Sequence, residues 1–210
     1  MGVIASTNNM PSAKFQSPKN LDTIRANRSF TVKLAVRNLA TGNFVNAAAN
    51  YFSAPQTVNS SGNIIGHSHV VIEKINGLSD TSVTDPSRFA FFKGLNEKAQ
   101  DGVLSVEVID GLPVGAYRFA SINSAANHQP VLVAVAQHGA LDDMVYVRVF
   151  RVYLLGSSCL YFPPDFCDGG RKLEFKTPVL ISNSSYCVGV HVVPFFVAVN
   201  SHVPSQVPFK

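Results

Sequence analysis

Histidine is the residue type whose grouping in this sequence could support chemistry. Four of the six histidines fall in two segments, because His67 and His69 stand two residues apart and His128 and His138 stand ten apart. If the first segment is a β-strand, both of its imidazoles leave the same face, about 6–7 Å apart at a rise of roughly 3.3 Å per residue. Two imidazoles on one strand face can share a metal ion, and the second pair, in predicted loops at the ends of another strand, could complete the site.

A carboxylate could add a further ligand. Glu73 lies on the same predicted strand face as the first histidine pair, and Asp142 and Asp143 are adjacent acidic residues near the second pair. Three or four imidazoles with such a carboxylate would suit Zn(II) or Cu(II). The adjacent aspartates also fit a turn before the last strand. In the competing interpretation, the histidines satisfy backbone groups of loops or stand half exposed beside Asn and Asp side chains.

His128 and His138 are too far apart along the chain for both to join His67 and His69 if the segment between them is extended. A fully extended strand of ten residues would hold His128 and His138 about 33 Å apart. We therefore expect His67, His69 and one of these two to form a group. His128 is favoured, because the turn over residues 127–130 can present it to a neighbouring strand.

Three functional classes fit these residues: a structural metal-binding protein, a metal-dependent enzyme and a carbohydrate-binding module. A closed site of four histidines would be structural, whereas three ligands and a water would suit a copper or zinc enzyme. A serine nucleophile is not indicated, because Ser68 points to the strand face opposite the histidines and the sequence has no GxSxG motif; it has no GxGxxG motif for a dinucleotide either. The third class, a cell-wall or carbohydrate-binding module, requires an exposed aromatic row, whereas Phe89, Phe91 and Phe92 fit core packing.

Short strands must position these side chains. In FTVKLAVRN, Phe30, Val32, Leu34 and Val36 alternate with less apolar residues, which is typical of a half-buried antiparallel strand. The other predicted strands are HSHVVIEKI, VLSVEVI, YRFASIN, VLVAVA and MVYVRV, and the helix candidates are short turns around DPSRFAFF or NEKAQ. The spacing of these strands and their Gly/Pro punctuation predict an antiparallel β-sandwich.

One turn gives this architecture more detail. In LPVGAY, residues 112–117, a Pro/Gly turn delivers Tyr117 to the start of a strand. This arrangement resembles the tyrosine corner of immunoglobulin-like and fibronectin-like sandwiches, in which the hydroxyl bonds back to the backbone. We therefore expect an immunoglobulin-like sandwich, although an ordinary Pro-Gly turn would have the same sequence.

Charge and hydropathy narrow the classes of partner. Of 17 Lys and Arg and 13 Asp and Glu, residues 1–146 hold 11 and 10, which leaves 6 and 3 for residues 147–210. A nucleic-acid-binding face requires clustered basic residues, which the first segment lacks. The chain has no apolar run of 18 residues, so we expect no transmembrane helix. The N-terminus lacks the basic and apolar regions of a signal peptide.

The sequence pattern changes near residue 147. All three cysteines, Cys159, Cys167 and Cys187, lie beyond it, and Pro194 interrupts the most apolar run. Two interpretations are a hydrophobic appendage and an out-of-frame or unspliced extension, and the conflict among local signals favours the second. The predicted organisation is an N-terminal segment over 1–29, a sandwich domain over 30–149 and an irregular extension over 150–210.

The motifs GHSHVVIE, NHQP and QHGALDDMVY resemble a family of small secreted proteins from basidiomycete and ascomycete fungi, over about residues 1–147. The biochemical function of this family is not settled, and the charge count does not support the description "ribosomal protein" that some members carry. The resemblance implies an extracellular β-sandwich with His67, His69, His128 and His138 at motif positions. The expected partner is a cell-wall or other extracellular molecule. Such proteins begin with a signal peptide and end soon after the position of Tyr146, so the resemblance implies a truncated or misread gene.

Overall fold

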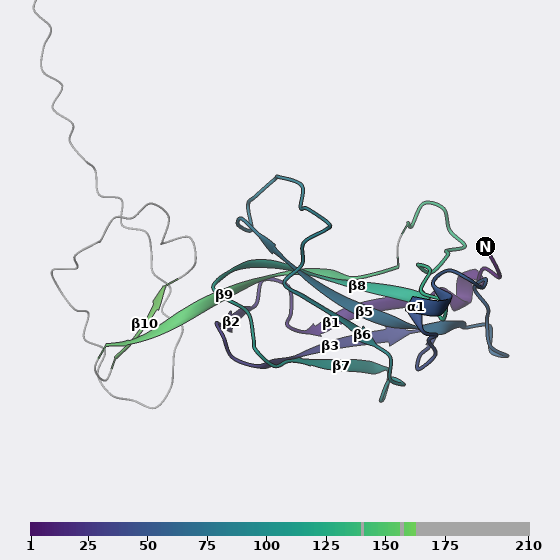
Figure 1. The fold of residues 1–210 in the computed structure, drawn as a ribbon, viewed down its shortest axis with the longest axis horizontal. Helices are drawn as coiled ribbons and strands as arrows, with labels where there is room; N and C mark the ends of the chain where they lie inside the picture. Colours follow the sequence, from purple (N-terminus) through teal and green to yellow (C-terminus); the bar gives the residue numbers. More distant parts are fainter. Residues whose placement is uncertain (140, 156–157, 163–210) are drawn as a thin grey trace, which may run out of the picture. The chain divides into compact units, whose positions relative to one another are not determined.

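Two β-sheets form the described part of the protein (Figure 1). The computed structural model describes residues 1–139, 141–155 and 158–162. The smaller sheet has the order β1-β3-β7 and is antiparallel. Its strands are β1 (Ser12–Ser17), β3 (Phe30–Arg37) and β7 (Val103–Val108).

The larger sheet has the order β10-β9-β8-β5-β4, with β2 paired to β9 and β6 paired to β5. The β2–β9 and β4–β5 pairs are parallel, and the other pairs are antiparallel. The strands are β2 (Thr23–Arg25), β4 (Leu39–Ala40), β5 (Ile64–Ile75), β6 (Phe91–Leu95), β8 (Gly115–Ala125), β9 (Met144–Leu155) and β10 (Ser158–Phe162).

The core lies between the two sheets. Phe119 of β8 is fully buried and meets Phe15 of β1 edge to face, with ring centroids 6.4 Å apart. Strand β3 has the predicted alternation, with Val32 and Leu34 buried and Lys33 exposed. Buried residues come from both sheets: Phe15, Val32, Leu34, Val70, Ile72, Leu104, Val108, Phe119, Val145, Val147 and Val149. The predicted all-β sandwich is therefore confirmed.

The sheets extend beyond the predicted 30–149 domain. Strands β1 and β2 lie before residue 30, and β9 and β10 continue past residue 149. The backbone of Ala26 donates to the carbonyl of Phe150 at 2.7 Å, which fastens the N-terminal segment to β9. Predictions for residues 163–210, which include Cys167, Cys187 and Pro194, fall outside the described residues.

Two predicted elements are wrong. VLVAVA is not a strand, because only Pro130 and Val131 contact β8, and the backbone N–H of Leu132 bonds instead to the side-chain oxygen of Gln56. Neither segment expected to turn helically contains a helix: DPSRFAFF has a turn closed by the bond from the backbone N–H of Arg88 to the Asp85 carbonyl and ends in β6, and NEKAQ follows β6. The short helices are η1 (Thr7–Asn9) and α1 (Ala47–Asn50).

The predicted burial of the phenylalanines holds for one of the three. Phe91 packs against the core, whereas Phe89 and Phe92 are about half exposed. Strand alternation on β6 explains the difference between Phe91 and Phe92, since neighbouring side chains leave opposite faces.

The tyrosine turn closes as the sequence predicts. The hydroxyl of Tyr117 donates a hydrogen bond to the carbonyl oxygen of Pro113 at 2.8 Å, and the Tyr117 side chain is buried. This bond joins the start of β8 to the loop before it. No helix in the described part of the chain is long and apolar enough to cross a membrane.

Replacing Tyr117 with phenylalanine should lower the free energy of unfolding by about 0.5–1.5 kcal/mol, because the hydrogen bond from the buried Tyr117 side chain to the Pro113 carbonyl is lost. Urea unfolding at equilibrium measures this cost. Tyr146→Phe is the matched control, since its hydroxyl is partly exposed and contacts only the sulfur of Met144 at 3.6 Å. Equal costs for both variants would show that the Tyr117 hydroxyl does not stabilise the turn.

Candidate metal site

Three histidine side chains meet on the face of β5 that points away from the core. One ring nitrogen from each of His67, His69 and His128 lies within 4.8 Å of the other two. The Nε2 atom of His67 is central, at 3.2 Å from Nε2 of His69 and 3.1 Å from Nδ1 of His128. His67 is fully buried and His69 is 9% exposed, so the group lies just below the surface.

Pairing of β5 with β8 places the first two histidines. Their ladder runs without interruption for ten residue pairs, from Gly66 opposite Ala125 to Ile75 opposite Ala116. Val70 and Ile72 of β5 enter the core, so the residues that alternate with them, His67 and His69 included, face outward. A Cβ atom at Gly66 would clash with the Ser124 carbonyl, so this close approach of the two strands requires glycine.

A tight turn after β8 brings in the third histidine. The backbone N–H of His128 bonds to the carbonyl of Ala125 at 2.8 Å, and that of Ala125 bonds to the carbonyl of Gln129 at 3.0 Å. His128 has φ 70°, in the left-handed region that few non-glycine residues adopt. This backbone conformation presents the imidazole to His67.

The second nitrogen of each ring faces a backbone carbonyl oxygen. His67 Nδ1 lies 3.1 Å from the oxygen of Asn43, and His69 Nδ1 lies 3.3 Å from that of Ile122. His128 Nε2 lies 2.6 Å from the oxygen of Val45. A carbonyl oxygen can only accept, so the tautomers that satisfy these carbonyls place the ring protons on the outer nitrogens. His69 Nδ1 also lies 3.3 Å from the hydroxyl of Ser124. In these tautomers the three nitrogens that face one another are unprotonated, with their lone pairs converging.

This arrangement has the donor spacing of a metal site. Three acceptors cannot hydrogen-bond to one another, whereas a metal ion between them would accept all three lone pairs. With bonds of about 2.0–2.1 Å, neighbouring ligand nitrogens lie about 2.9 Å apart at a right angle and about 3.3 Å apart at a tetrahedral angle. The two separations from His67 Nε2, 3.1 and 3.2 Å, fall between these values, and the nitrogens of His69 and His128 lie within 4.8 Å of each other. Backbone partners on the outer nitrogens also fix tautomer and ring orientation, as in known metal sites.

Burial keeps His67 and His69 neutral. The pKa of His67 is lowered to about 4, chiefly by burial and in smaller part by the neighbouring imidazoles, because two positive charges would repel. Burial also lowers the pKa of His69 below its usual value. Neutral imidazole is the form of histidine that can act as a metal ligand.

The loop before α1 supplies two of the three carbonyls. Its backbone is fastened to both central strands, because the N–H of Asn43 bonds to the Gly66 carbonyl and that of Val45 to the Ala126 carbonyl, each at 3.1 Å. The side chain of Asn43 also donates to the carbonyl of Ala40 at 2.9 Å. The sequence carries no signal for these contacts, because any residue type has a carbonyl.

His138 is not in this group. Its side chain is exposed, and its backbone N–H closes a turn with the carbonyl of Val135 at 3.1 Å. The expected strand between His128 and His138 is absent from this described segment, so nothing carries His138 back towards the other three.

The expected carboxylate ligands have other partners. Glu73 is largely buried and pairs with Arg118, its partner across β8, with Oε2 at 2.8 Å from Nε and in contact with Nη2. Asp142 accepts from the backbone of Asn123 at 2.6 Å, and burial raises the pKa of its carboxyl. The group of candidate ligands within the described residues therefore contains histidine alone.

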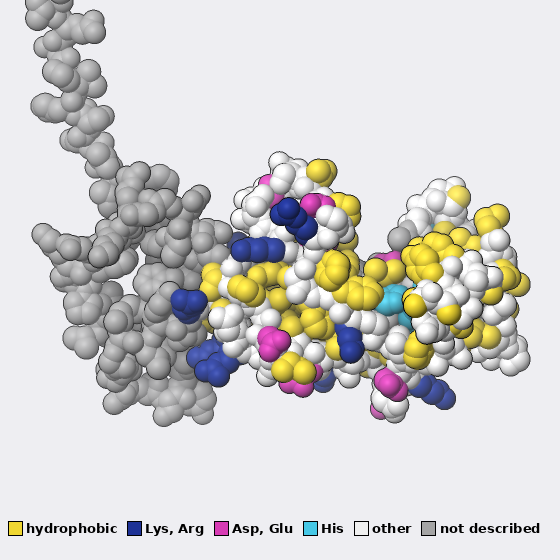
Figure 2. Space-filling view, in the orientation of Figure 1, with side chains coloured by type: hydrophobic (Ala, Val, Ile, Leu, Met, Phe, Trp, Pro, Cys, Tyr) yellow, Lys and Arg dark blue, Asp and Glu magenta, His cyan; other side chains and the backbone are white. Residues whose placement is uncertain are grey.

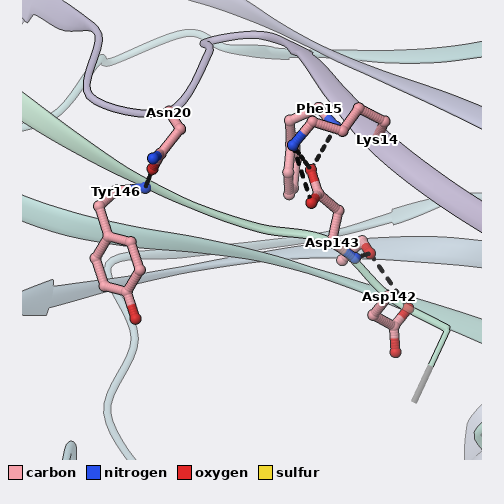
Figure 3. A network of polar contacts seen from close by, with 7 residues as sticks. Lys14, Phe15, Asn20, Asp142, Asp143 and Tyr146 are labelled. Atoms are coloured by element: carbon pink, nitrogen blue, oxygen red, sulfur yellow. Dashed lines mark hydrogen bonds and ion pairs between the residues drawn. The ribbon is translucent and has the colours of Figure 1, made fainter. Parts of the chain in front are cut away.

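Asp143 joins the two sheets (Figure 3). Its carboxylate accepts from the backbone of Phe15 at 2.8 Å and pairs with the ammonium group of Lys14 at 3.0 Å, both on β1. Its own backbone N–H bonds to the hydroxyl of Ser121 at 2.9 Å. The aspartate pair thus fastens the extended segment before β9, where the expected turn is absent, and does not reach the histidines.

Asp143→Ala should lower the free energy of unfolding by about 1–3 kcal/mol, because the backbone N–H of the buried Phe15 loses its acceptor. Lys14→Ala should cost about 0–1 kcal/mol, since the Lys14 side chain is 66% exposed and a surface ion pair contributes little. Urea unfolding measures both. If the two variants lose the same stability, the ion pair and not the backbone bond holds β1 here.

Comparison with known proteins relates this sequence to a fungal one. Residues 13–150 match the family described as "CLU5d N-terminal domain". A relative from Colletotrichum graminicola, described as "Pathogenicity cluster 5 protein d", is 47% identical over 145 residues. The match covers 68% of this chain and 30% of the relative, so this chain spans less than a third of that protein. All three grouped histidines lie within the matched residues.

Proposed function

The chain belongs to the family of the CLU5d N-terminal domain, and from this and its histidine group we propose that it is a transition-metal-binding protein. His67, His69 and His128 are the proposed ligands, and Cu(II) and Zn(II) are the ions whose preferences fit three neutral imidazoles. We further propose that the protein acts outside the cell. Support for this comes from the motifs that resemble secreted fungal proteins, and from the relative described as a pathogenicity cluster protein.

The convergence of three unprotonated nitrogens carries this proposal. Histidines that only satisfied loop backbone groups would need one carbonyl partner each, and these three have one. That role would set no direction for the second nitrogen of each ring, yet Nε2 of His67 lies 3.2 Å from Nε2 of His69 and 3.1 Å from Nδ1 of His128. With the ring protons on the outer nitrogens, buried lone pairs at this distance repel one another, and a cation between them would remove that repulsion.

A metal-dependent enzyme is the second candidate. The observation that favours it is the count of ligands in the described part of the chain, which is three and does not include His138. Three ligands leave a coordination position for water or a substrate, as in catalytic sites. The geometry supports metal binding more directly than catalysis, because within the described residues no carboxylate or further histidine joins the three nitrogens as a general acid or base.

Calorimetric titration of the metal-free protein at pH 7 with Cu(II) and with Zn(II) tests the proposed function. We expect one ion per chain and a Kd below about 100 μM for at least one of the two metals. X-ray absorption of the loaded protein should show nitrogen ligands at about 2.0–2.1 Å. Binding of neither ion below about 100 μM would overturn the proposal and leave the histidines with a structural role.

A further inference from the structure

Aromatic rings continue the histidine group across the surface on both sides. On one side Tyr51 stacks over His128, with centroids 6.1 Å apart at 27°, and Phe52 stacks on Tyr51 at 4.1 Å and 16°. On the other side Phe92 stacks on His69 at 5.4 Å and 23°. We call these rings, together with Phe44 and Phe89, the aromatic row.

Two further rings, Phe89 and Phe44, contact this group. Phe89 lies 6.1 Å from Phe92, and Phe44 meets His67 edge-on at 6.1 Å. The row thus joins the loop at α1, the turn after β8, β5 and β6. It is the exposed aromatic row that the sequence did not predict.

These rings are exposed although they are large and apolar. Tyr51 is 62% exposed, Phe52 is 51% and Phe92 is 48%. Figure 2 shows a histidine at the surface between hydrophobic side chains on either side. Exposed apolar groups that gather in one place mark a binding surface more often than scattered ones do.

The segments that build most of this surface are uncharged. Residues 38–72 and 119–141 contain no Lys, Arg, Asp or Glu. They supply Phe44, Tyr51 and Phe52 as well as the three histidines. A polyanion such as nucleic acid would need basic residues here. Arginine is also enriched in protein–protein interfaces, and these segments have none.

The polar groups beside the exposed rings are uncharged amides and hydroxyls. The side chain of Asn127 donates to the carbonyl of Asn50 at 2.9 Å and to the hydroxyl of Ser53 at 3.0 Å, directly beside Tyr51. Asn46 and Asn50, at the two ends of α1, stand in the same loop as Tyr51 and Phe52. Amides and hydroxyls beside exposed rings match a ligand that presents both C–H faces and hydroxyl groups.

We propose that the aromatic row binds a neutral polysaccharide whose pyranose rings stack on the exposed aromatic side chains. The axial C–H groups of a pyranose carry partial positive charge and face the electron-rich surface of an aromatic ring, while its hydroxyls bond to neighbouring amides. The inference deepens the proposed metal function, because it names the class of molecule that would lie over the three histidines. Stacking itself does not require the metal.

Sedimentation of the full chain with suspended cellulose, chitin and β-1,3-glucan tests the inference. We expect retention on at least one of these polymers. The double variant Tyr51→Ala with Phe52→Ala should weaken that binding at least about tenfold, because it removes two stacking rings. Ile109→Ala is the matched control, since Ile109 is 73% exposed and is not in the aromatic row. It should leave retention unchanged.

The outcomes separate this inference from the metal site. Each assay is run with EDTA and again with Cu(II), and the ring variants decide the inference in both conditions. Retention that depends on the rings, with no metal binding in calorimetry, would support the polysaccharide site and overturn the metal function alone. Retention on none of the three polymers, or equal retention of the ring variant, would overturn the polysaccharide site. A dimer in size-exclusion chromatography that the ring variant abolishes would also overturn it, because a second copy would then cover the row.

Discussion

Replacing His67 with alanine should weaken the binding of Cu(II) and Zn(II) by at least about 100-fold. Its Nε2 atom is the one that lies within 3.2 Å of both other ligand nitrogens, so its loss leaves two imidazoles without the central ligand. Loss of an outer hydrogen-bond partner alone costs a metal site about 10–100-fold, and loss of a ligand costs more. Titration calorimetry with each ion measures the change.

Two further variants keep this result interpretable. His138→Ala should bind as the unmodified protein does, because His138 is outside the histidine group. His128→Gly should lose binding as His67→Ala does without loss of folding, since glycine adopts the φ of 70° at that position freely. Unchanged affinity in both ligand variants would show that the metal binds elsewhere.

Acidification should destabilise the metal-free protein. An unfolded histidine has a pKa of about 6.5, whereas burial lowers the pKa of His67 to about 4 in the folded state. Between these values the unfolded chain binds a proton that the folded chain does not, so stability falls as the pH falls. The difference of about 2.5 pKa units corresponds to about 3 kcal/mol, lost between about pH 6.5 and pH 4.

Comparison with His67→Gln isolates this contribution, because several carboxyl groups titrate over the same range. Urea unfolding in EDTA at steps from pH 7 to pH 4 should show a stability difference between the two proteins that narrows with acid. The loss should level off below about pH 4, where both states bind the proton. A difference that stays constant with pH would mean that folded His67 titrates as an exposed histidine does.

Much of the fold can be predicted from local pattern. Alternation in FTVKLAVRN identifies β3, and the His-x-His spacing within a strand places His67 and His69 on one face. The turn chemistry before Tyr117 predicts its hydrogen bond to Pro113. Each of these features depends on neighbours in sequence, and strand periodicity is enough to find them.

Features that depend on distant partners could not be predicted. VLVAVA has strand composition, but the side chain of Gln56 takes the backbone donor that a neighbouring strand would need. The carboxylate of Glu73 lies on the predicted face, yet its partner Arg118 comes from a strand pairing that composition does not reveal. The exposed rings likewise depend on where the loop at α1 packs against the turn after β8.

Strand β5 uses both of its faces, with Val70 and Ile72 in the core and His67 and His69 outside. If β5 slipped by one residue against β8, the histidines would enter the core and the aliphatic side chains would face solvent. Such a misaligned chain could not bring His128 to the other two rings. A metal ion present while the chain folds would therefore lower the free energy of the correct alignment alone. Metal binding on the outer face of β5 would then favour the register that places the aliphatic side chains of its inner face in the core.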